Sequence, residues 1–374
     1  MRAAYVFVSV LFLLAIIFVA LIWNFAIGSS PAEPRLKLNA TCKFGNLTGI
    51  CKTNNSCIGY PITTKLEPCN EGDLSLVCCP THEINRPKRT PGQKAKDMCE
   101  SYGKTAIIII ENPTLIRGSR PTEKPDCPVE EKLIKGGKNA RDREFPHMVE
   151  IAKFFSGYPG TVQSVCGGSI VSPKFVLSAA HCNVTEEDGY VIFGTIYKFK
   201  GIDESFTNHS SSINKVFIHP HYNASMNNND IALYELTITL SEHERPICLD
   251  TGISLFNMKA IATGFGINEE GKTKDVLQKT GLTIVDPGSC AKKYDGTNVY
   301  LPQHYLCAFE EGKDSCGGDS GGPLQVSHGG LKCMYTLIGI TSIGDNCTLN
   351  SSIPGVYTKV SDYIEWIEDI VWPA

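Results

Sequence analysis

The sequence predicts an all-β protein in which a small, cysteine-rich segment precedes a much larger β domain. Residues 134–374 contain short β-branched runs, such as Val191–Phe193 and Tyr335–Ile340, that are separated by Gly, Pro and Asn turns. This spacing is typical of barrels and sandwiches. Six cysteines lie within residues 42–79, and a segment this short buries so little core that it needs disulfides to fold.

The chain begins with an apolar run over residues 3–27, after Arg2. The small residues Ala26 and Gly28 at its end predict a signal peptide over residues 1–28, cleaved after Gly28. The run is also long enough to span a bilayer, so an uncleaved signal anchor is the alternative.

Cysteine usage and glycosylation motifs both indicate a secreted, extracellular chain. The chain has 16 cysteines and no C-x-x-C pair beside a histidine, which favours disulfides over zinc and predicts no metal site. The net charge of −4 excludes a nucleic-acid partner. Asn-x-Ser/Thr motifs, which are acceptors only in exported proteins, occur at Asn39, Asn46, Asn54, Asn183, Asn208, Asn223, Asn346 and Asn350.

Residues 80–133 are rich in proline with scattered Lys and Arg, which predicts an extended, mobile linker. The exception is Ala106–Ile110, an apolar tract that would favour aggregation if left bare. We expect it to lie as a strand or ribbon against the C-terminal domain. Near the chain end, apolar residues from Tyr363 to Val371 recur every three or four positions after Ser361, which predicts a helix.

Three short segments carry residues typical of nucleophilic catalysis: Ala179–Cys182, Asp230–Leu233 and Asp314–Pro323. A serine hydroxyl needs an imidazole to accept its proton, and the imidazole needs a buried carboxylate to fix its tautomer. Each segment alone has an ordinary interpretation as a turn or a structural histidine. Together, and in the order His, Asp, Ser, they predict that Ser320 is the nucleophile, His181 the base and Asp230 the orienting carboxylate.

These segments resemble the chymotrypsin/trypsin family of serine endopeptidases over residues 134–374. The resemblance implies a chymotrypsin-like fold of two six-stranded β-barrels with a C-terminal helix. It also implies an oxyanion hole formed by the backbone N–H groups of Gly318 and Ser320, which would stabilise the charge that develops on the substrate carbonyl.

The same resemblance places Asp314 at the bottom of the primary specificity pocket, with Gly344 and Gly355 as its small wall residues. A carboxylate in an apolar slot favours a cationic partner, so cleavage after Arg or Lys is expected; the alternative for Asp314 is an exposed surface position. Ser342 and Gly344 are expected to pair with the substrate backbone as an added strand. Ile343 stands where the family commonly has an aromatic residue.

Residues Leu133–Gly137 resemble the activation junction of the family. Cleavage after Leu133 would free the Ile134 amine to pair with the Asp319 carboxylate and shape the oxyanion hole. An enzyme with Asp314 in its pocket should not cut after leucine, which predicts an upstream activating protease of chymotrypsin or elastase type. Cleavage after Lys132 instead would shift the new terminus by one residue.

The cysteine spacing over residues 42–79, with the Cys78–Cys79 doublet, resembles the clip domain of arthropod serine proteases, and the Leu-Ile junction resembles the snake-like subgroup. Clip domains are docking or regulatory units; the alternative is an inert disulfide knot. The resemblance implies the disulfides Cys42–Cys78, Cys51–Cys69, Cys57–Cys79, Cys127–Cys248, Cys166–Cys182, Cys290–Cys307 and Cys316–Cys347. Cys99 and Cys333 remain, either as a further pair or as two free or intermolecular thiols.

The sequence therefore predicts a secreted clip-domain zymogen that cleaves protein precursors in an extracellular cascade of innate immunity or developmental signalling, with serpin-type inhibitors as further partners. Alternatives are a noncatalytic homologue acting as a binding cofactor and a digestive enzyme. No cofactor is expected to be required. The loop of residues 200–208, with Asp203 and Glu204, is either a calcium site or a pair of exposed acids.

Overall fold

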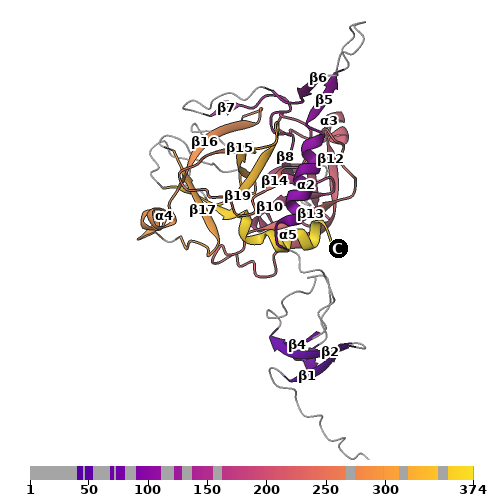
Figure 1. Ribbon diagram of the computed structural model, residues 1–374, viewed down its shortest axis with the longest axis vertical. Helices are drawn as coiled ribbons and strands as arrows, with labels where there is room; N and C mark the ends of the chain where they lie inside the picture. Colours follow the sequence, from indigo (N-terminus) through magenta and orange to yellow (C-terminus); the bar gives the residue numbers. More distant parts are fainter. Residues whose placement is uncertain are drawn as a thin grey trace, which may run out of the picture. The chain divides into compact units, whose positions relative to one another are not determined.

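The computed structural model describes residues 40–44, 47–53, 68–70, 73–80, 90–110, 122–128, 137–154, 162–266, 274–297, 299–310, 319–343 and 353–373. The chain divides into two compact units, Met1–Pro87 and Lys88–Ala374 (Figure 1). No helix within the described ranges has the length and apolar character needed to cross a bilayer. The predicted signal segment, residues 1–28, lies outside these ranges.

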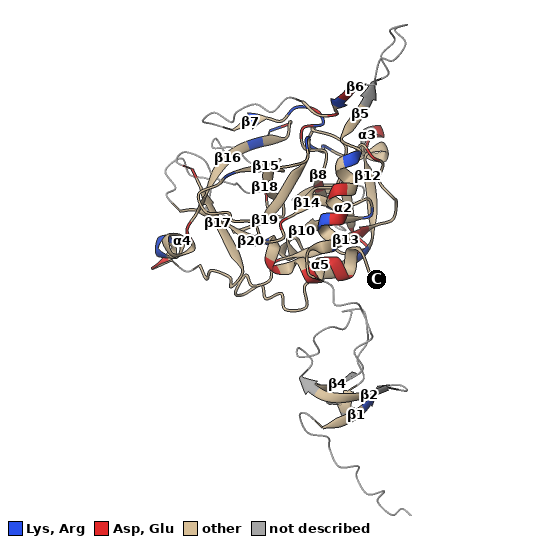
Figure 2. Cartoon of the chain, in the orientation of Figure 1, with Lys and Arg blue, Asp and Glu red and all other residues tan. Residues whose placement is uncertain are grey.

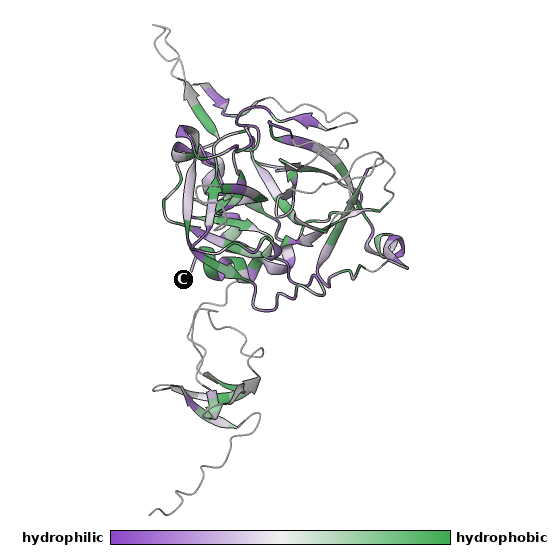
Figure 3. Ribbon diagram, turned by 180° about the vertical axis from the view of Figure 1, so that it is seen from behind, coloured by the Kyte–Doolittle hydropathy of each residue, from purple (hydrophilic) through white to green (hydrophobic). Residues whose placement is uncertain are grey.

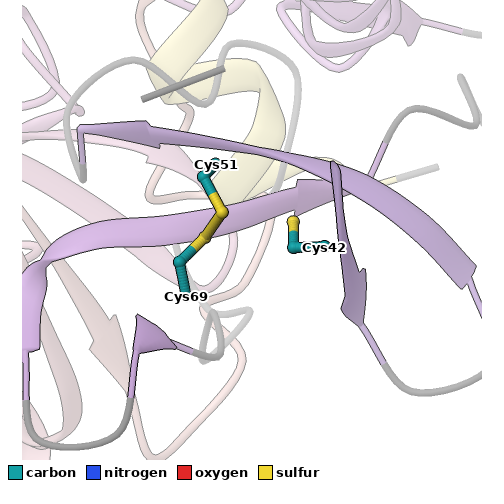
Figure 4. Close-up of side chains that lie close together, drawn as sticks. All are labelled: Cys42, Cys51 and Cys69. Atoms are coloured by element: carbon teal, nitrogen blue, oxygen red, sulfur yellow. A yellow bond between two sulfur atoms is a disulfide. The ribbon is translucent and has the colours of Figure 1, made fainter. Parts of the chain in front are cut away.

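The first unit contains one antiparallel sheet stapled by disulfides. Its strand order is β1 (Thr41–Phe44), β2 (Leu47–Thr53), β4 (Asp73–Pro80) and β3 (Pro68–Asn70). The pairs Cys42–Cys78 and Cys51–Cys69 are both formed, as predicted, and Figure 4 shows the Cys51–Cys69 bond beside Cys42. These buried cysteines make up the small core of the sheet, so the sulfur bridges stabilise a unit that has little apolar surface to bury. The predicted Cys57–Cys79 pair includes Cys57, which lies outside the described residues.

The second unit contains a closed barrel of six strands. Its interior is filled by β-branched and aliphatic side chains, with Ile151, Ile170 and Leu177 fully buried. The strands, in chain order, are β8 (Met148–Phe154), β9 (Val162–Ser172), β10 (Phe175–Ser178), β11 (Gly189–Ile192), β12 (Ser210–Ile218) and β13 (Ala232–Leu236).

A second ring of six strands follows, because β19 pairs with both β18 and β20 and so closes the sheet. Leu324, Ile338 and Tyr357 are buried inside it. The strands of this ring are β15 (Lys259–Gly264), β16 (Gln278–Val285), β17 (Tyr305–Phe309), β18 (Pro323–Ser327), β19 (Tyr335–Ile343) and β20 (Gly355–Lys359). The predicted double-barrel fold is confirmed.

Short elements complete this unit. Two of them attach to the second barrel: β14 (Cys248–Leu249) pairs in parallel with β19, and β7 (Lys138–Asn139) pairs with β16. The predicted C-terminal helix is present as a 3-10 turn, η3 (Val360–Tyr363), followed by α5 (Ile364–Val371). The remaining helical elements are η2 (Ala180–Cys182), α3 (Glu204–Asn208) and α4 (Pro287–Tyr294).

Helix α2 (Gln93–Lys104) forms where an extended linker was predicted, and that prediction is wrong for these residues. Its buried residues Ala95, Cys99 and Tyr102 recur at helical spacing, and the helix lies along β14 and α5 (Figure 1). The backbone N–H of Ala95 donates to Glu368 Oε1 at 2.8 Å. This contact places the buried carboxylate of Glu368 at the positive end of the α2 helix dipole. Figure 2 shows that α5 carries acidic residues.

The predicted disulfides Cys127–Cys248 and Cys99–Cys333 are both wrong, because the same four cysteines pair differently in the structure. The structure pairs Cys99 with Cys248 and Cys127 with Cys333. The reason is α2, which places Cys99 directly on β14, where Cys248 lies. Cys127 follows later in the chain and reaches the turn before β19 instead.

An ionic contact lies next to the Cys127–Cys333 disulfide in the chain. The Asp126 carboxylate accepts from the guanidinium of Arg143 and, at 3.3 Å, from that of the buried Arg245. Burial lowers the pKa of Arg245, and the nearby Asp126 opposes that shift. Residues 90–110 and 122–128 are therefore an integral part of the second unit.

The isoleucine tract forms a strand, as predicted, but not against a barrel. Strand β5 (Ile107–Ile110) pairs with β6 (Thr122–Pro125) in a separate two-stranded sheet. Ile107 and Ile108 are 37% and 47% exposed, and Figure 3 shows the hydrophobic β5 beside the hydrophilic β6. The base of this hairpin is fixed by the Asp126 N–H, which donates to the Ala106 carbonyl at 2.8 Å.

A buried histidine connects the two barrels. His147, just before β8, lies 2.6 Å through Nε2 from Gln325 Oε1 on β18, and Gln325 in turn donates to Thr263 Oγ1 at 3.2 Å. Burial lowers the pKa of His147 to about 3, although the Gln325 contact opposes this shift. The folded protein therefore holds this imidazole neutral, whereas the unfolded chain protonates it near pH 6.5.

This difference predicts acid sensitivity. Below about pH 6.5 the unfolded state binds a proton that the folded state excludes, so His147 lowers the free energy of unfolding by about 1.4 kcal/mol per pH unit until about pH 3. Urea unfolding at pH 7, 6 and 5 measures the slope. His147→Phe, which cannot titrate, should flatten it by that amount, and an unchanged slope would refute the assignment.

Candidate active site

The predicted base and its carboxylate partner lie in contact. His181 is in η2, and the confirmed Cys166–Cys182 disulfide ties this turn to β9. Asp230 is buried just before β13. His181 Nδ1 lies 2.7 Å from Asp230 Oδ2, and the His181 backbone N–H donates to Asp230 Oδ1 at 2.9 Å. The pair of contacts fixes both the ring and its backbone, so Nε2 is left to face the nucleophile.

A third donor completes the environment of Asp230. Ser342 Oγ donates to Asp230 Oδ2 at 2.5 Å, and Thr358 Oγ1 donates to the Asp230 carbonyl. Burial alone would raise the pKa of the Asp230 carboxyl, but the bonds from His181 and Ser342 outweigh it and hold the pKa below its ordinary value. Asp230 therefore stays ionised, as an orienting group must. Ser342 was predicted only as a substrate-pairing residue, and its side-chain role was missed.

The turn that carries Ser320 is fixed against the same part of the first barrel. Gly167 N–H on β9 donates to the Ser320 carbonyl at 2.7 Å, and Gly321 N–H donates to the Thr341 carbonyl at 2.8 Å. Gly321 has φ +75°, and a Cβ there would lie 2.1 Å from Ser178 Oγ. Only glycine fits this close approach. Because Ser178 precedes η2 by two residues, the turn brings Ser320 to the side of the barrel that carries His181.

Asp319, the predicted counter-ion, lies in a cradle made by two glycines. Its Oδ1 accepts from the Gly266 N–H at 2.9 Å. A Cβ built on Gly264 would lie 1.9 Å from the same oxygen, and one on Gly266 2.7 Å. The sequence analysis missed both glycines, although the Gly-x-Gly spacing after a buried strand was a readable signal for a close approach.

Other predicted site residues have mixed outcomes. Gly355 begins β20, opposite Ala308 of β17, and the disulfide Cys290–Cys307 is confirmed. Asp203 caps α3 by accepting the Phe206 N–H at 2.8 Å, so one oxygen of the candidate calcium loop serves the helix. Outside the described residues lie Leu133, Ile134, Asp314, Gly318, Gly344 and the Cys316–Cys347 pair.

The described geometry supports proton transfer from a serine hydroxyl. An imidazole held by a buried, ionised carboxylate is a base of fixed tautomer, and its cationic form is stabilised by that carboxylate. Ser320 is half-buried and sits on a rigid turn beside it. The arrangement suits nucleophilic attack on a carbonyl followed by protonation of the leaving group.

Comparison with known proteins gives the same picture. Residues 134–367 match the family model "Trypsin". The chain is 29% identical to CLIP domain-containing serine protease B4 of Anopheles gambiae, with 80% of this chain and 88% of that protein aligned. It is 30% identical to serine protease snk of Drosophila melanogaster, over 83% of this chain and 72% of that protein. CLIP domain-containing serine protease B9 of Anopheles gambiae is 33% identical, over 68% and 67%.

Proposed function

Because the chain belongs to the trypsin family of serine proteases, as a snake-like member with a clip domain, we propose that it is a secreted zymogen that cleaves protein precursors after Arg or Lys in an extracellular cascade. The observation that carries this proposal is the bonding of Asp230 to both His181 and Ser342 beside the Ser320 turn. Noncatalytic homologues usually lose the nucleophile, whereas this chain has Ser320 together with His181 and Asp230. The disulfides of the described residues are consistent with an extracellular protein.

In the proposed reaction, Ser320 Oγ attacks the scissile carbonyl carbon while His181 accepts the hydroxyl proton. The same imidazole then donates that proton to the leaving amine, and a water molecule repeats the cycle on the acyl-enzyme. Asp230 remains ionised throughout and stabilises the imidazolium. The N–H groups of Gly318 and Ser320 would bind the oxyanion.

Specificity follows from Asp314, six residues before Ser320. A carboxylate at the base of the primary pocket would pair with the guanidinium or ammonium of the substrate. Protein substrates, an activating protease and serpin-type inhibitors are the proposed partners, in keeping with the named clip-domain relatives.

Activation would follow cleavage between Leu133 and Ile134. The glycine cradle supports this proposal, because the close approach of Gly264 and Gly266 fixes the position of the Asp319 carboxylate. Leucine before the cut excludes efficient self-activation by an enzyme that prefers basic residues.

One experiment tests the junction and the pocket together. The secreted zymogen is treated with a chymotrypsin- or elastase-type protease, its heavy chain is sequenced from the N-terminus, and the product is profiled on a peptide library. We expect Ile134 as the first residue and hydrolysis after Arg or Lys at least about 100-fold faster than after Phe, as expected when a buried carboxylate must pair. Leu133 as the first residue would refute the proposed junction, and equal rates on Phe and Arg peptides would refute the pocket.

A further inference from the structure

Two of the asparagines in Asn-x-Ser/Thr motifs lie beside the catalytic residues. Asn183 follows His181 by two positions, and Asn223 is paired with Asn228, which precedes Asp230 by two positions. His181 and Asp230 are themselves joined by two hydrogen bonds. Both motifs therefore start from the same region of the molecule, although they are 40 residues apart in the chain.

The Asn223 side chain is oriented for modification. Asn223 is exposed, and its Oδ1 accepts from the Ser225 N–H at 3.0 Å and from Ser225 Oγ at 2.7 Å. These bonds direct the Asn223 amide oxygen toward the backbone of the 223–228 loop. The amide nitrogen, on the opposite side of the group, therefore points away from the loop. Within the described residues, this nitrogen donates no hydrogen bond, and it is the atom to which a glycan attaches.

The loop that carries Asn223 is rigid and lies at the edge of the active site. The Asn223 N–H donates to the Asn228 carbonyl at 3.0 Å, which closes the loop of residues 223–228. Asn228 Oδ1 accepts the Gln303 N–H at 3.0 Å and so joins this loop to the segment before β17. The Asp230 charge raises the pKa of the neighbouring Tyr222, in addition to the effect of burial, so the loop base is close to the catalytic carboxylate.

Asn183 is also exposed, two positions after His181. Its backbone is held in the left-handed region, with φ 50°, and its carbonyl accepts from Lys153 Nζ at 2.9 Å. Its side chain is exposed and has no hydrogen-bond partner among the described residues. A glycan at this position needs no rearrangement of the catalytic turn.

We propose that N-linked glycans on Asn183 and Asn223 border the substrate cleft and restrict it to extended polypeptide segments. This inference rests on the proposed peptidase function for the existence of the cleft. An extended strand occupies only the cleft itself, whereas a broad globular protein must also cover the surface around His181 and the 223–228 loop. Bulky glycans at these positions hinder the docking of a globular protein and leave the binding of an extended strand unaffected.

The test begins with glycopeptide mass spectrometry on the full chain secreted from a eukaryotic host, which should show glycans at both Asn183 and Asn223. Asn183→Gln and Asn223→Gln remove the acceptors, and Ser225→Ala removes the second glycan while keeping Asn223. Asn208→Gln is the matched control, because Asn208 ends α3, whose Phe206 packs among Ala152, Val162 and Ile192 in a different cluster.

After activation, each variant is assayed with a tripeptidyl-arginine amide and with a Kunitz-type protein inhibitor. Loss of either cleft glycan should raise the association rate of the inhibitor by about threefold or more, because access limits docking, and should leave kcat/KM on the peptide unchanged. The control should change neither value.

Unmodified asparagine at position 183 or 223, or an inhibitor rate that matches the control, would overturn the inference. If the wild-type chain hydrolyses no arginyl amide, the proposed function fails instead. Glycan occupancy, measured on the unactivated chain, still decides the modification independently.

Discussion

Replacing Ser320 with alanine should abolish hydrolysis of arginyl peptides, lowering kcat by about 10⁶-fold. His181 and Asp230 remain bonded in this variant, but no hydroxyl is left to attack the carbonyl. Steady-state kinetics of the activated enzyme measure the effect. The variant should still bind substrate and keep the oxyanion hole. Its residual rate should therefore be about 10³-fold above the uncatalysed rate of hydrolysis in water.

The half-buried Ser361 at the start of the C-terminal helical region offers a matched control, because its hydroxyl contacts only Asp362 in the described structure. Ser361→Ala should retain wild-type turnover. A fluorophosphonate probe should label the wild type and the control and should not label the Ser320 variant. Labelling of Ser320→Ala would contradict the assignment, and a wild type that folds but reacts with neither probe nor peptide would favour the noncatalytic alternative.

The second large effect is expected at Gly264. A methyl group there would lie 1.9 Å from Asp319 Oδ1, so Gly264→Ala must displace the carboxylate that we propose as the counter-ion of the new Ile134 amine. Without that pair the oxyanion hole loses its shape, and kcat should fall by about 100-fold or more, the range seen when an oxyanion donor is lost. Kinetics after complete cleavage at the junction measure this loss separately from activation itself.

Gly329→Ala is the control for this substitution, because a Cβ at Gly329 meets no atom within 4 Å. It should leave both turnover and the melting temperature unchanged. Full activity in cleaved Gly264→Ala would show that Asp319 does not act from this cradle. A failure of the variant to fold is distinguished by circular dichroism and by normal secretion of the zymogen.

The sequence predicted the barrels and the candidate catalytic residues because the signals for both are local. Strand spacing and turn residues can be read within a few positions, and each catalytic residue stands in its own short motif. The bond from Ser342 to Asp230 joins residues 112 positions apart, so nothing in either motif indicated it. The glycine cradle of Asp319 likewise depends on a contact between distant turns.

Residues 90–128 were the least predictable part of the chain. Ala95, Cys99 and Tyr102 have helical spacing, but the surrounding prolines favoured an extended interpretation, and the tertiary contacts with β14 and α5 decide the outcome. The disulfide exchange has the same origin. Cysteine positions are visible in a sequence, whereas their pairing depends on which elements lie together in space.

The disulfides Cys99–Cys248 and Cys127–Cys333 determine what would remain joined after cleavage at the proposed junction. Both disulfides link residues before Leu133 to the second barrel or its edge, so the N-terminal sheet would stay covalently attached to the second unit after that cleavage. A protein that binds this sheet would therefore have a raised effective concentration at the second unit. If a precursor bound to that sheet, it would be cleaved faster without any added contact at Ser320.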